Sequence, residues 1–283
     1  MKKFVYNENI DMLEIPADQF AAGIDHARKS GHWKVRVMGG PSPAKARPLD
    51  LGALDDDSPL LSLNLSGDNI DLKGTDLGPL YRLKQLASLS VPYLRGRIDF
   101  SRLATLDTLH ITGADHAVQP LALPALKDLL LVSSRNKDAA FLSGLTGLQK
   151  LRISGGRMEQ LSGIETLGQL ASLRIDHCPA LLDIRAVNAL PRLATLYVEK
   201  CARLRDCAFL ADNQTIEALF VSELDSAAFA PRMRKLASLK FWDLKDGDLR
   251  PLAASTTLKD VHFHPRKRHY THSVDELNAL LRR

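Results

Sequence analysis

The amino-acid sequence predicts an α/β solenoid with a parallel β-sheet on its concave face, short 3₁₀, helical or irregular segments on its convex face, and a helical cap at each end. Two observations predict this fold class. Residues 170–178 (LASLRIDHC) recur almost unchanged 23 residues later as residues 193–201 (LATLYVEKC), and a weaker copy occupies residues 148–156. The same spacing of apolar residues continues at intervals of 20 to 26 residues. Such self-similarity indicates one stacked structural unit per interval.

About ten units share a single register over residues 60–264. Because side chains alternate along a strand, the fourth and sixth places of each unit point into the core, whereas the third, fifth and seventh places point outward. The sixth places are often β-branched or aromatic, as strands favour. A single unit cannot bury its own leucines, so neighbouring units must stack. The fourth places are Leu63, Leu89, Leu109, Leu129, Leu151, Leu173, Leu196, Leu219, Leu239 and Val261.

Apolar residues at the first, fourth and sixth places, followed by cysteine at the ninth, are the signature of a leucine-rich repeat. The chain resembles leucine-rich-repeat proteins over most of its length, and its units of 20–23 residues resemble the short class found in bacterial internalins and phosphatase-regulating repeat proteins. The short return segments favour single 3₁₀ turns. At the ninth place asparagine is absent and only Cys178 and Cys201 match, so we expect an incomplete internal hydrogen-bond ladder.

Residues 1–59 are predicted to form an N-terminal cap and a loop outside the repeats. Residues 17–28 follow Pro16 and place apolar side chains on one helical face, and glycine then ends the helix. Residues 33–38 alternate as a half-buried strand. Residues 41–59 are rich in proline and aspartate, which indicates a solvated connector. The alternative is a functional acidic lip at residues 55–57.

Residues 265–283 are predicted to form a basic loop and a capping helix. Ser273 and Glu276 have the spacing of a capping box and precede an apolar helical face. We expect this helix to cover the last unit of the array, which leaves no additional catalytic domain.

Composition is typical of a folded globular protein, with 45% hydrophobic and 25% charged residues. The net charge of +5 favours an acidic partner but is too small to argue for nucleic acid by itself. No apolar run fits a secretion signal or a membrane span. Cys178, Cys201 and Cys207 fall at core positions of the repeat, so we expect reduced thiols and a cytoplasmic protein without membrane contact.

The sequence contains no recognisable catalytic motif, and we expect no enzymatic activity, cofactor or metal. Phosphate-binding loops, nucleophile elbows and His-Glu-x-x-His motifs are absent. His262, His264, His269 and His272 have a spacing that allows a metal site, but no cysteine or carboxylate joins them at a recognisable interval. A polar last unit with a basic tail is the favoured interpretation.

The outward-facing fifth and seventh places predict a partner-binding site in the second half of the array. There the side chains become large, aromatic and charged, and such surfaces are favoured at protein interfaces. The alternative is that the rings of Tyr197, Phe220 and Trp242 pack across the strands only to stabilise the sheet. The candidate residues are Arg152, Arg174, Asp176, Tyr197, Glu199, Phe220, Lys240, Trp242 and His262.

The sequence therefore predicts a non-catalytic regulator, adaptor or inhibitor that recognises another protein through its concave face. That partner would carry an acidic and apolar patch, and the chain itself is expected to be a monomer. The short repeats favour a bacterial source, for which a toxin-neutralising or effector protein is the natural role. The alternative is binding of an anionic ligand or nucleic acid by Arg152, Arg174, Lys240 and the basic tail, and an enzyme is the remote alternative.

Overall fold

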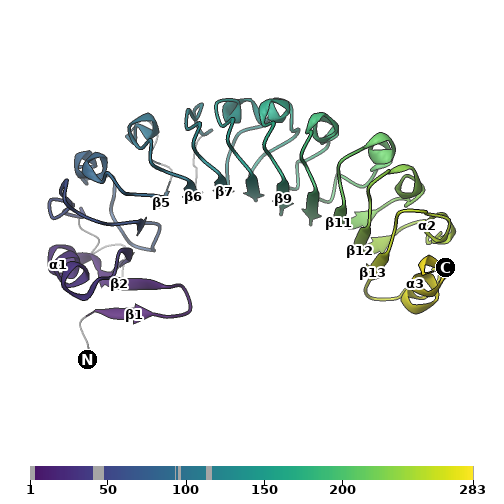
Figure 1. Cartoon of the computed structure of the whole chain (residues 1–283), viewed down its shortest axis with the longest axis horizontal. Coiled ribbons are helices and arrows are strands. Elements are labelled where there is room, and N and C mark those ends of the chain that lie inside the picture. The colour runs from purple at the N-terminus through teal and green to yellow at the C-terminus, as the bar shows by residue number, and fades with distance from the viewer. Residues whose placement is uncertain (1–3, 41–47, 93, 95–96, 113–116, 283) are drawn as a thin grey trace.

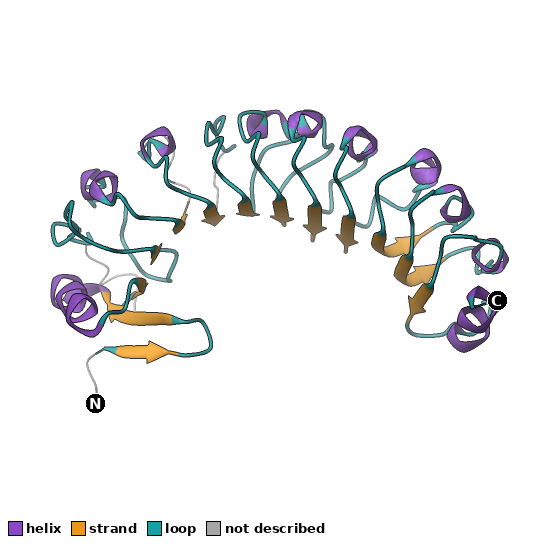
Figure 2. Ribbon diagram, in the orientation of Figure 1, coloured by secondary structure: helices purple, strands orange, loops and turns teal. Residues whose placement is uncertain are grey.

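The computed structural model describes residues 4–40, 48–92, 94, 97–112 and 117–282, which form an arch (Figure 1). Strands stack side by side along the concave face, and helices lie along the convex face (Figure 2). The first and last elements, β1 and α3, lie at opposite ends of the arch. Within the described ranges, no helix is long and apolar enough to cross a membrane.

The described residues form one 13-stranded sheet whose strands follow chain order. All neighbouring strands from β2 onward are parallel, and only β1 and β2 pair antiparallel. The strands are β1 (Val5–Asn7), β2 (Met12–Pro16), β3 (Lys34–Met38), β4 (Ser62–Asn64), β5 (Ser88–Pro92), β6 (Thr108–Thr112), β7 (Asp128–Val132), β8 (Lys150–Ser154), β9 (Ser172–Asp176), β10 (Thr195–Glu199), β11 (Ala218–Leu224), β12 (Ser238–Leu244) and β13 (Asp260–Phe263).

The return segments on the convex face are mostly single 3₁₀ turns, as the unit length predicts. Longer helices occur towards the two ends of the arch. Within the residues that the structure describes, the helical segments are η1 (Ala17–Gln19), α1 (Phe20–Ser30), η3 (Gly78–Arg82), η4 (Phe100–Arg102), η5 (Ala140–Leu142), η6 (Ile164–Thr166), η7 (Arg185–Ala189), η8 (Ala208–Asp212), η9 (Ala230–Arg232), α2 (Arg250–Ala253) and α3 (Val274–Leu281).

The strand register aligns equal places of successive repeats, which confirms the predicted solenoid. Leu151 pairs with Leu173, which pairs with Leu196. The fourth and sixth places of all ten predicted units are buried, as the alternation of side chains requires. The leucines of each unit thus pack on those of its neighbours, and one continuous core runs through the arch.

The N-terminal residues differ from the prediction by contributing strands of their own. The expected helix and strand are present as α1 and β3, but β1 and β2 precede them. Leu13 of β2 pairs with Val35 of β3, and Val35 pairs with Leu63 of β4. Leu13 and Val35 therefore stand at the fourth place, and the parallel sheet begins at β2. The sequence signature is absent there because α1 replaces the leucine-bearing return segment.

The loop before the first predicted repeat lies partly outside the described residues, since Pro41 and Pro43 fall among residues 41–47. In the part that the structure describes, Asp55 forms an ion pair with Arg28 at 2.7 Å, and Asp56 forms one with Lys84 at 3.1 Å. These pairs tie the loop to its neighbours.

The C-terminal helix α3 covers the last strand. Its capping box is present as predicted: the Ser273 hydroxyl accepts from the backbone N–H of Glu276, whose carboxylate accepts from the backbone N–H of Ser273. The Asn278 side chain donates to the Val261 carbonyl at 3.0 Å and accepts from the Val261 N–H at 2.9 Å. Asn278 thereby satisfies backbone groups that a further strand would otherwise pair.

Candidate functional site

Strands β8 to β13 bring the fifth-place side chains into one column on the concave face. Arg152 pairs in register with Arg174, and the pairing continues through Tyr197, Phe220 and Lys240. His262 follows on β13. The predicted residues of this column are therefore neighbours, each one strand away from the next.

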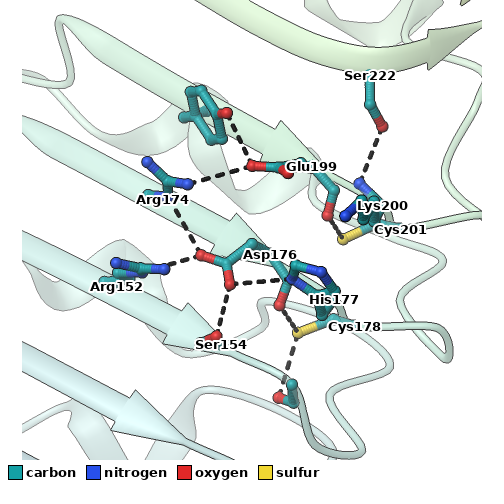
Figure 3. Close-up of polar contacts among 12 residues, drawn as sticks. Arg152, Ser154, Arg174, Asp176, His177, Cys178, Glu199, Lys200, Cys201 and Ser222 are labelled. Atoms are coloured by element: carbon teal, nitrogen blue, oxygen red, sulfur yellow. Dashed lines mark hydrogen bonds and ion pairs between the residues drawn. The ribbon is translucent and has the colours of Figure 1, made fainter.

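Asp176 departs from the alternation that predicts an outward, exposed side chain at the seventh place. Its side chain is only 2% exposed and lies between the two arginines (Figure 3). Its Oδ1 accepts from Arg152 Nε at 2.9 Å and from Arg174 Nε at 3.1 Å. Its Oδ2 accepts from the Ser154 hydroxyl and lies 3.3 Å from His177 Nδ1. The surrounding side chains thus cover the carboxylate.

The hydrogen bonds around Asp176 keep it ionised. Burial alone would raise the pKa of this carboxyl, but the bonds from Ser154, Arg152, His177 and Arg174 outweigh burial and lower the pKa to about 2. Asp176 is therefore a carboxylate at neutral pH, and it partly neutralises the two guanidinium groups that contact it.

Glu199 forms a second acidic centre one strand further along. Its Oε2 accepts from Arg174 Nη2 at 3.1 Å and from the Tyr197 hydroxyl at 2.8 Å. The guanidinium carbon of Arg174 lies 4.1 Å from the centroid of the Tyr197 ring, within the range of a cation–π contact. Burial and the bond to Glu199 raise the pKa of Tyr197, so its hydroxyl stays protonated.

Tyr197, Phe220 and Trp242, which we call the aromatic row, continue the network onto β11 and β12. The Tyr197 and Phe220 rings are stacked, with centroids 4.2 Å apart, and the Trp242 ring meets Phe220 edge-on at 5.4 Å. Trp242 remains 38% exposed, whereas the other two rings are half-buried. The rings therefore pack on one another and also present an apolar surface to solvent.

Lys240 and His262 share the column but stand outside this network. The exposed Lys240 side chain forms no ion pair or hydrogen bond with any residue that the structure describes. His262 Nε2 lies 3.0 Å from Asp260 Oδ1 on the same strand.

Two members of the network, Ser154 and His177, are not among the nine candidate residues, although His177 is one of the places that differ between the repeated segments 170–178 and 193–201, where specificity is expected. Ser154 occupies the seventh place of β8 and pairs in register with Asp176, so counting neighbours across units would have found it. His177 follows β9 with a left-handed φ of 57°, which directs its ring back towards Asp176. The same left-handed backbone recurs at the eighth place of neighbouring units, at Ser133, Gly155 and Lys200, and the glycine at this place is the sequence signal for the turn.

The arrangement of Ser154, Asp176 and His177 is not that of a nucleophilic triad. In a triad the histidine accepts the hydroxyl proton, whereas the Ser154 hydroxyl here donates to Asp176. In the described part of the chain, no group of three or more His, Cys, Asp or Glu side chains is placed to hold a metal ion.

The three cysteines are free thiols buried in the core. The Cys178 thiol donates to the Gly155 carbonyl at 3.3 Å, and the Cys201 thiol donates to the Glu199 carbonyl at 3.4 Å. The neighbouring Cys201 and burial raise the pKa of Cys178, the neighbouring Cys178 lowers the pKa of Cys201, and burial raises the pKa of Cys207 to about 12. All three sulfur atoms lie in the core, where a reagent in solution has little access to them.

We expect the native protein to react with a thiol reagent at least about 100-fold more slowly than the unfolded chain at pH 8. The release of thionitrobenzoate from Ellman's reagent, followed with and without denaturant, measures both rates. A thiol that reacts rapidly in the native protein would show that one of these cysteines is accessible.

Comparisons with known proteins agree with this architecture. No protein-family model matches the chain, and no curated protein matches it. A leucine-rich-repeat protein from Leptospira interrogans superposes with a TM-score of 0.53 at 16% identity, covering 85% of this chain and 59% of that one. This chain thus spans about three fifths of that protein's length.

Two proteins from Listeria monocytogenes are also similar. An internalin matches with a TM-score of 0.46 at 17% identity, covering 78% of each chain. The functional domain of InlJ, which includes a cysteine ladder, matches with a TM-score of 0.45 at 15% identity, covering 81% of this chain and 53% of that one. Together with the repeats and the parallel sheet, the likeness to the Leptospira protein establishes a leucine-rich-repeat solenoid. That fold generally serves protein interaction.

Proposed function

We propose that this chain is a non-catalytic recognition protein that binds another protein through its concave face, over strands β8 to β13. Asp176, which is buried, would hold Arg152 and Arg174 in position through its hydrogen bonds to them. The contacting residues would be Arg152, Arg174, Tyr197, Glu199, Phe220, Lys240, Trp242 and His262. A role as regulator, adaptor or inhibitor is compatible with such a surface.

The observation that carries the proposal is the aromatic row on the concave face. Aromatic rings beside arginines are the combination that most often dominates binding energy at protein interfaces. The Arg174–Tyr197–Phe220–Trp242 contacts hold these side chains in place, so binding would order few additional rotamers.

The direct test is affinity capture with the full chain, followed by mass spectrometry. The wild-type protein and a variant in which Tyr197, Phe220 and Trp242 are all alanine should be compared in the same lysate. A protein retained by the wild type and lost by the variant supports the proposal. A set of captured proteins that is identical for both would contradict it.

Binding of an anionic ligand or nucleic acid is the second candidate, favoured by the unpaired Lys240, which stands in the same column as the two arginines and three strands from Arg174. If these three cations carried the affinity for a random DNA duplex, the affinity would fall about 40-fold between 50 and 200 mM salt, since each phosphate contact contributes a slope of about −0.9. We expect the protein partner to change its affinity less than about fivefold over this range. Fluorescence anisotropy at the two salt concentrations separates the candidates.

We further propose a monomer that works in the cytoplasm of a bacterium, where toxin neutralisation or an effector function would suit the fold. The three free buried thiols support a reducing compartment. Light scattering of the purified chain tests the monomer, and a dimer at micromolar concentration would contradict it.

A further inference from the structure

Arg152 and Arg174, which we call the arginine fork, identify the chemistry of the partner; this inference rests on the proposed function. The two residues are in register on β8 and β9. Both donate from Nε to the same oxygen, Asp176 Oδ1, and Figure 3 shows the carboxylate between the two guanidinium groups. Like charges directly opposite each other in a sheet repel, so this shared carboxylate is what holds the pair together.

These bonds leave a defined set of donors without partners. Arg152 uses only Nε, so both of its terminal nitrogens lack a partner among the described residues, and its side chain is 46% exposed. Arg174 uses Nε and Nη2, so its Nη1 likewise lacks a partner within the described ranges. A guanidinium group has no acceptor atom, so the open positions can only donate.

We propose that the arginine fork binds one carboxylate of the partner protein, and that an apolar side chain next to this carboxylate lies on the aromatic row. The planar arrangement of guanidinium donors matches a carboxylate in bidentate geometry. Tyr197 and Phe220 stand one and two strands beyond Arg174, and neighbouring strands are about 4.8 Å apart, so the carboxylate and an apolar group on these two rings would be separated by about 5–10 Å. In an extended segment that distance corresponds to about one to three residues.

The charge balance favours a single carboxylate over a polyanion. Arg152 and Arg174 carry two positive charges and Asp176 and Glu199 carry two negative charges, so this network is neutral as a whole. It offers open donors to one carboxylate but no excess of positive charge to a polyanion. A run of phosphates would instead meet Asp176 and Glu199 as like charges.

Asp176 acts here as a positioning residue, because its buried carboxylate contacts the arginines and not the partner. This role and a purely electrostatic one predict opposite outcomes. If the fork acted only through its positive field, Asp176→Asn would add one net positive charge and strengthen binding of an anion. If the fork must be held in place, the same substitution weakens binding, because the arginines lose the negative charge that holds them side by side and must be ordered at the moment of binding.

The experiment is an NMR titration of the full chain that follows the arginine Nε–Hε signals. The probes are 3-phenylpropanoate, its neutral analogue 3-phenylpropanamide, and inorganic phosphate. We expect saturable shifts of the Arg152 and Arg174 signals with the carboxylate, and binding at least about tenfold weaker for the amide. Phosphate, which lacks the ring, should also bind more weakly.

Three variants sharpen the test. Arg152→Gln should abolish the saturable shift at Arg174. Asp176→Asn should weaken carboxylate binding at least about threefold and increase the mobility of both arginine side chains. Lys150→Gln is the matched control, because Lys150 is an exposed cation on the same strand that forms no ion pair within the described residues. We expect it to leave binding unchanged.

Equal affinity for the amide or for phosphate, unchanged binding by Arg152→Gln, or tighter binding by Asp176→Asn would each overturn the carboxylate fork. The proposed function is tested separately. A captured protein that still binds Arg152→Gln at wild-type affinity, but is lost when the aromatic row is removed, leaves that function standing and eliminates the fork.

Discussion

Simultaneous replacement of Tyr197, Phe220 and Trp242 by alanine is expected to lower the affinity for the partner at least about 100-fold. The stacked contact at 4.2 Å and the edge-on contact at 5.4 Å join the three rings into one surface, which the substitution removes entirely. Tyrosine and tryptophan at an interface centre commonly cost about 2 kcal/mol or more when truncated. Calorimetry with the captured partner measures the loss.

The same substitution also removes contacts within the sheet, so its effect on binding needs a control of matched stability. Each ring pair contributes about 0.5–1.5 kcal/mol to folding. Ile164→Val combined with Ile184→Val removes two buried methyl groups from the convex side, at a cost of about 0.5–1.5 kcal/mol each. If this control loses binding as completely as the triple variant does, the rings only stabilise the sheet and the proposed site is wrong.

Replacing Asp176 by alanine is expected to lower the free energy of unfolding by about 2–4 kcal/mol. The substitution leaves Arg152 and Arg174 side by side without their counter-charge and removes the acceptor of the half-buried Ser154 hydroxyl. The arginines are half-exposed and can turn to water, which keeps the cost below that of a fully buried pair. Urea denaturation followed by circular dichroism measures the change.

Asp248→Ala is the matched control for this prediction. The pKa of Asp248 is also lowered to about 2, by its bonds to Arg250, but this pair lies at the surface. Exposed pairs contribute little to stability, so the control should be much less destabilised than Asp176→Ala. Equal losses would show that burial of Asp176 has no energetic consequence.

Acid should remove the contribution of Asp176. Its pKa is about 2 in the folded chain, against an ordinary value of 3.8. Because the folded value is the lower one, ionisation stabilises the fold by about 2 kcal/mol above about pH 4, and this contribution disappears as the pH falls towards about 2. Asp176→Asn should therefore lose less unfolding free energy than the wild type between about pH 5 and pH 2. The same acid dependence in both proteins would contradict this assignment.

The architecture could be predicted from the sequence because the repeat encodes it locally. Leu173 and Ile175 recur at equal places in each unit, and side-chain alternation alone directs them inward. The capping box at Ser273 is equally local, since its partners lie three residues apart. Strand β2 could not be predicted from the repeat, because the helix α1 follows it in place of the leucine-bearing segment that marks a repeat unit in the sequence.

The sequence by itself therefore determined the fold, the core and the column of residues on the concave face, because each depends on spacing along the chain. Only the tertiary structure decided what those residues do to one another. Asp176 is buried because Arg152 and Ser154, more than 20 residues away in sequence, lie one strand away in space, and because His177 turns left-handed beside it. A charged side chain such as this carboxylate can be buried only when partners on neighbouring strands compensate the free-energy cost of its desolvation. Which side chains become its partners depends on the register between strands.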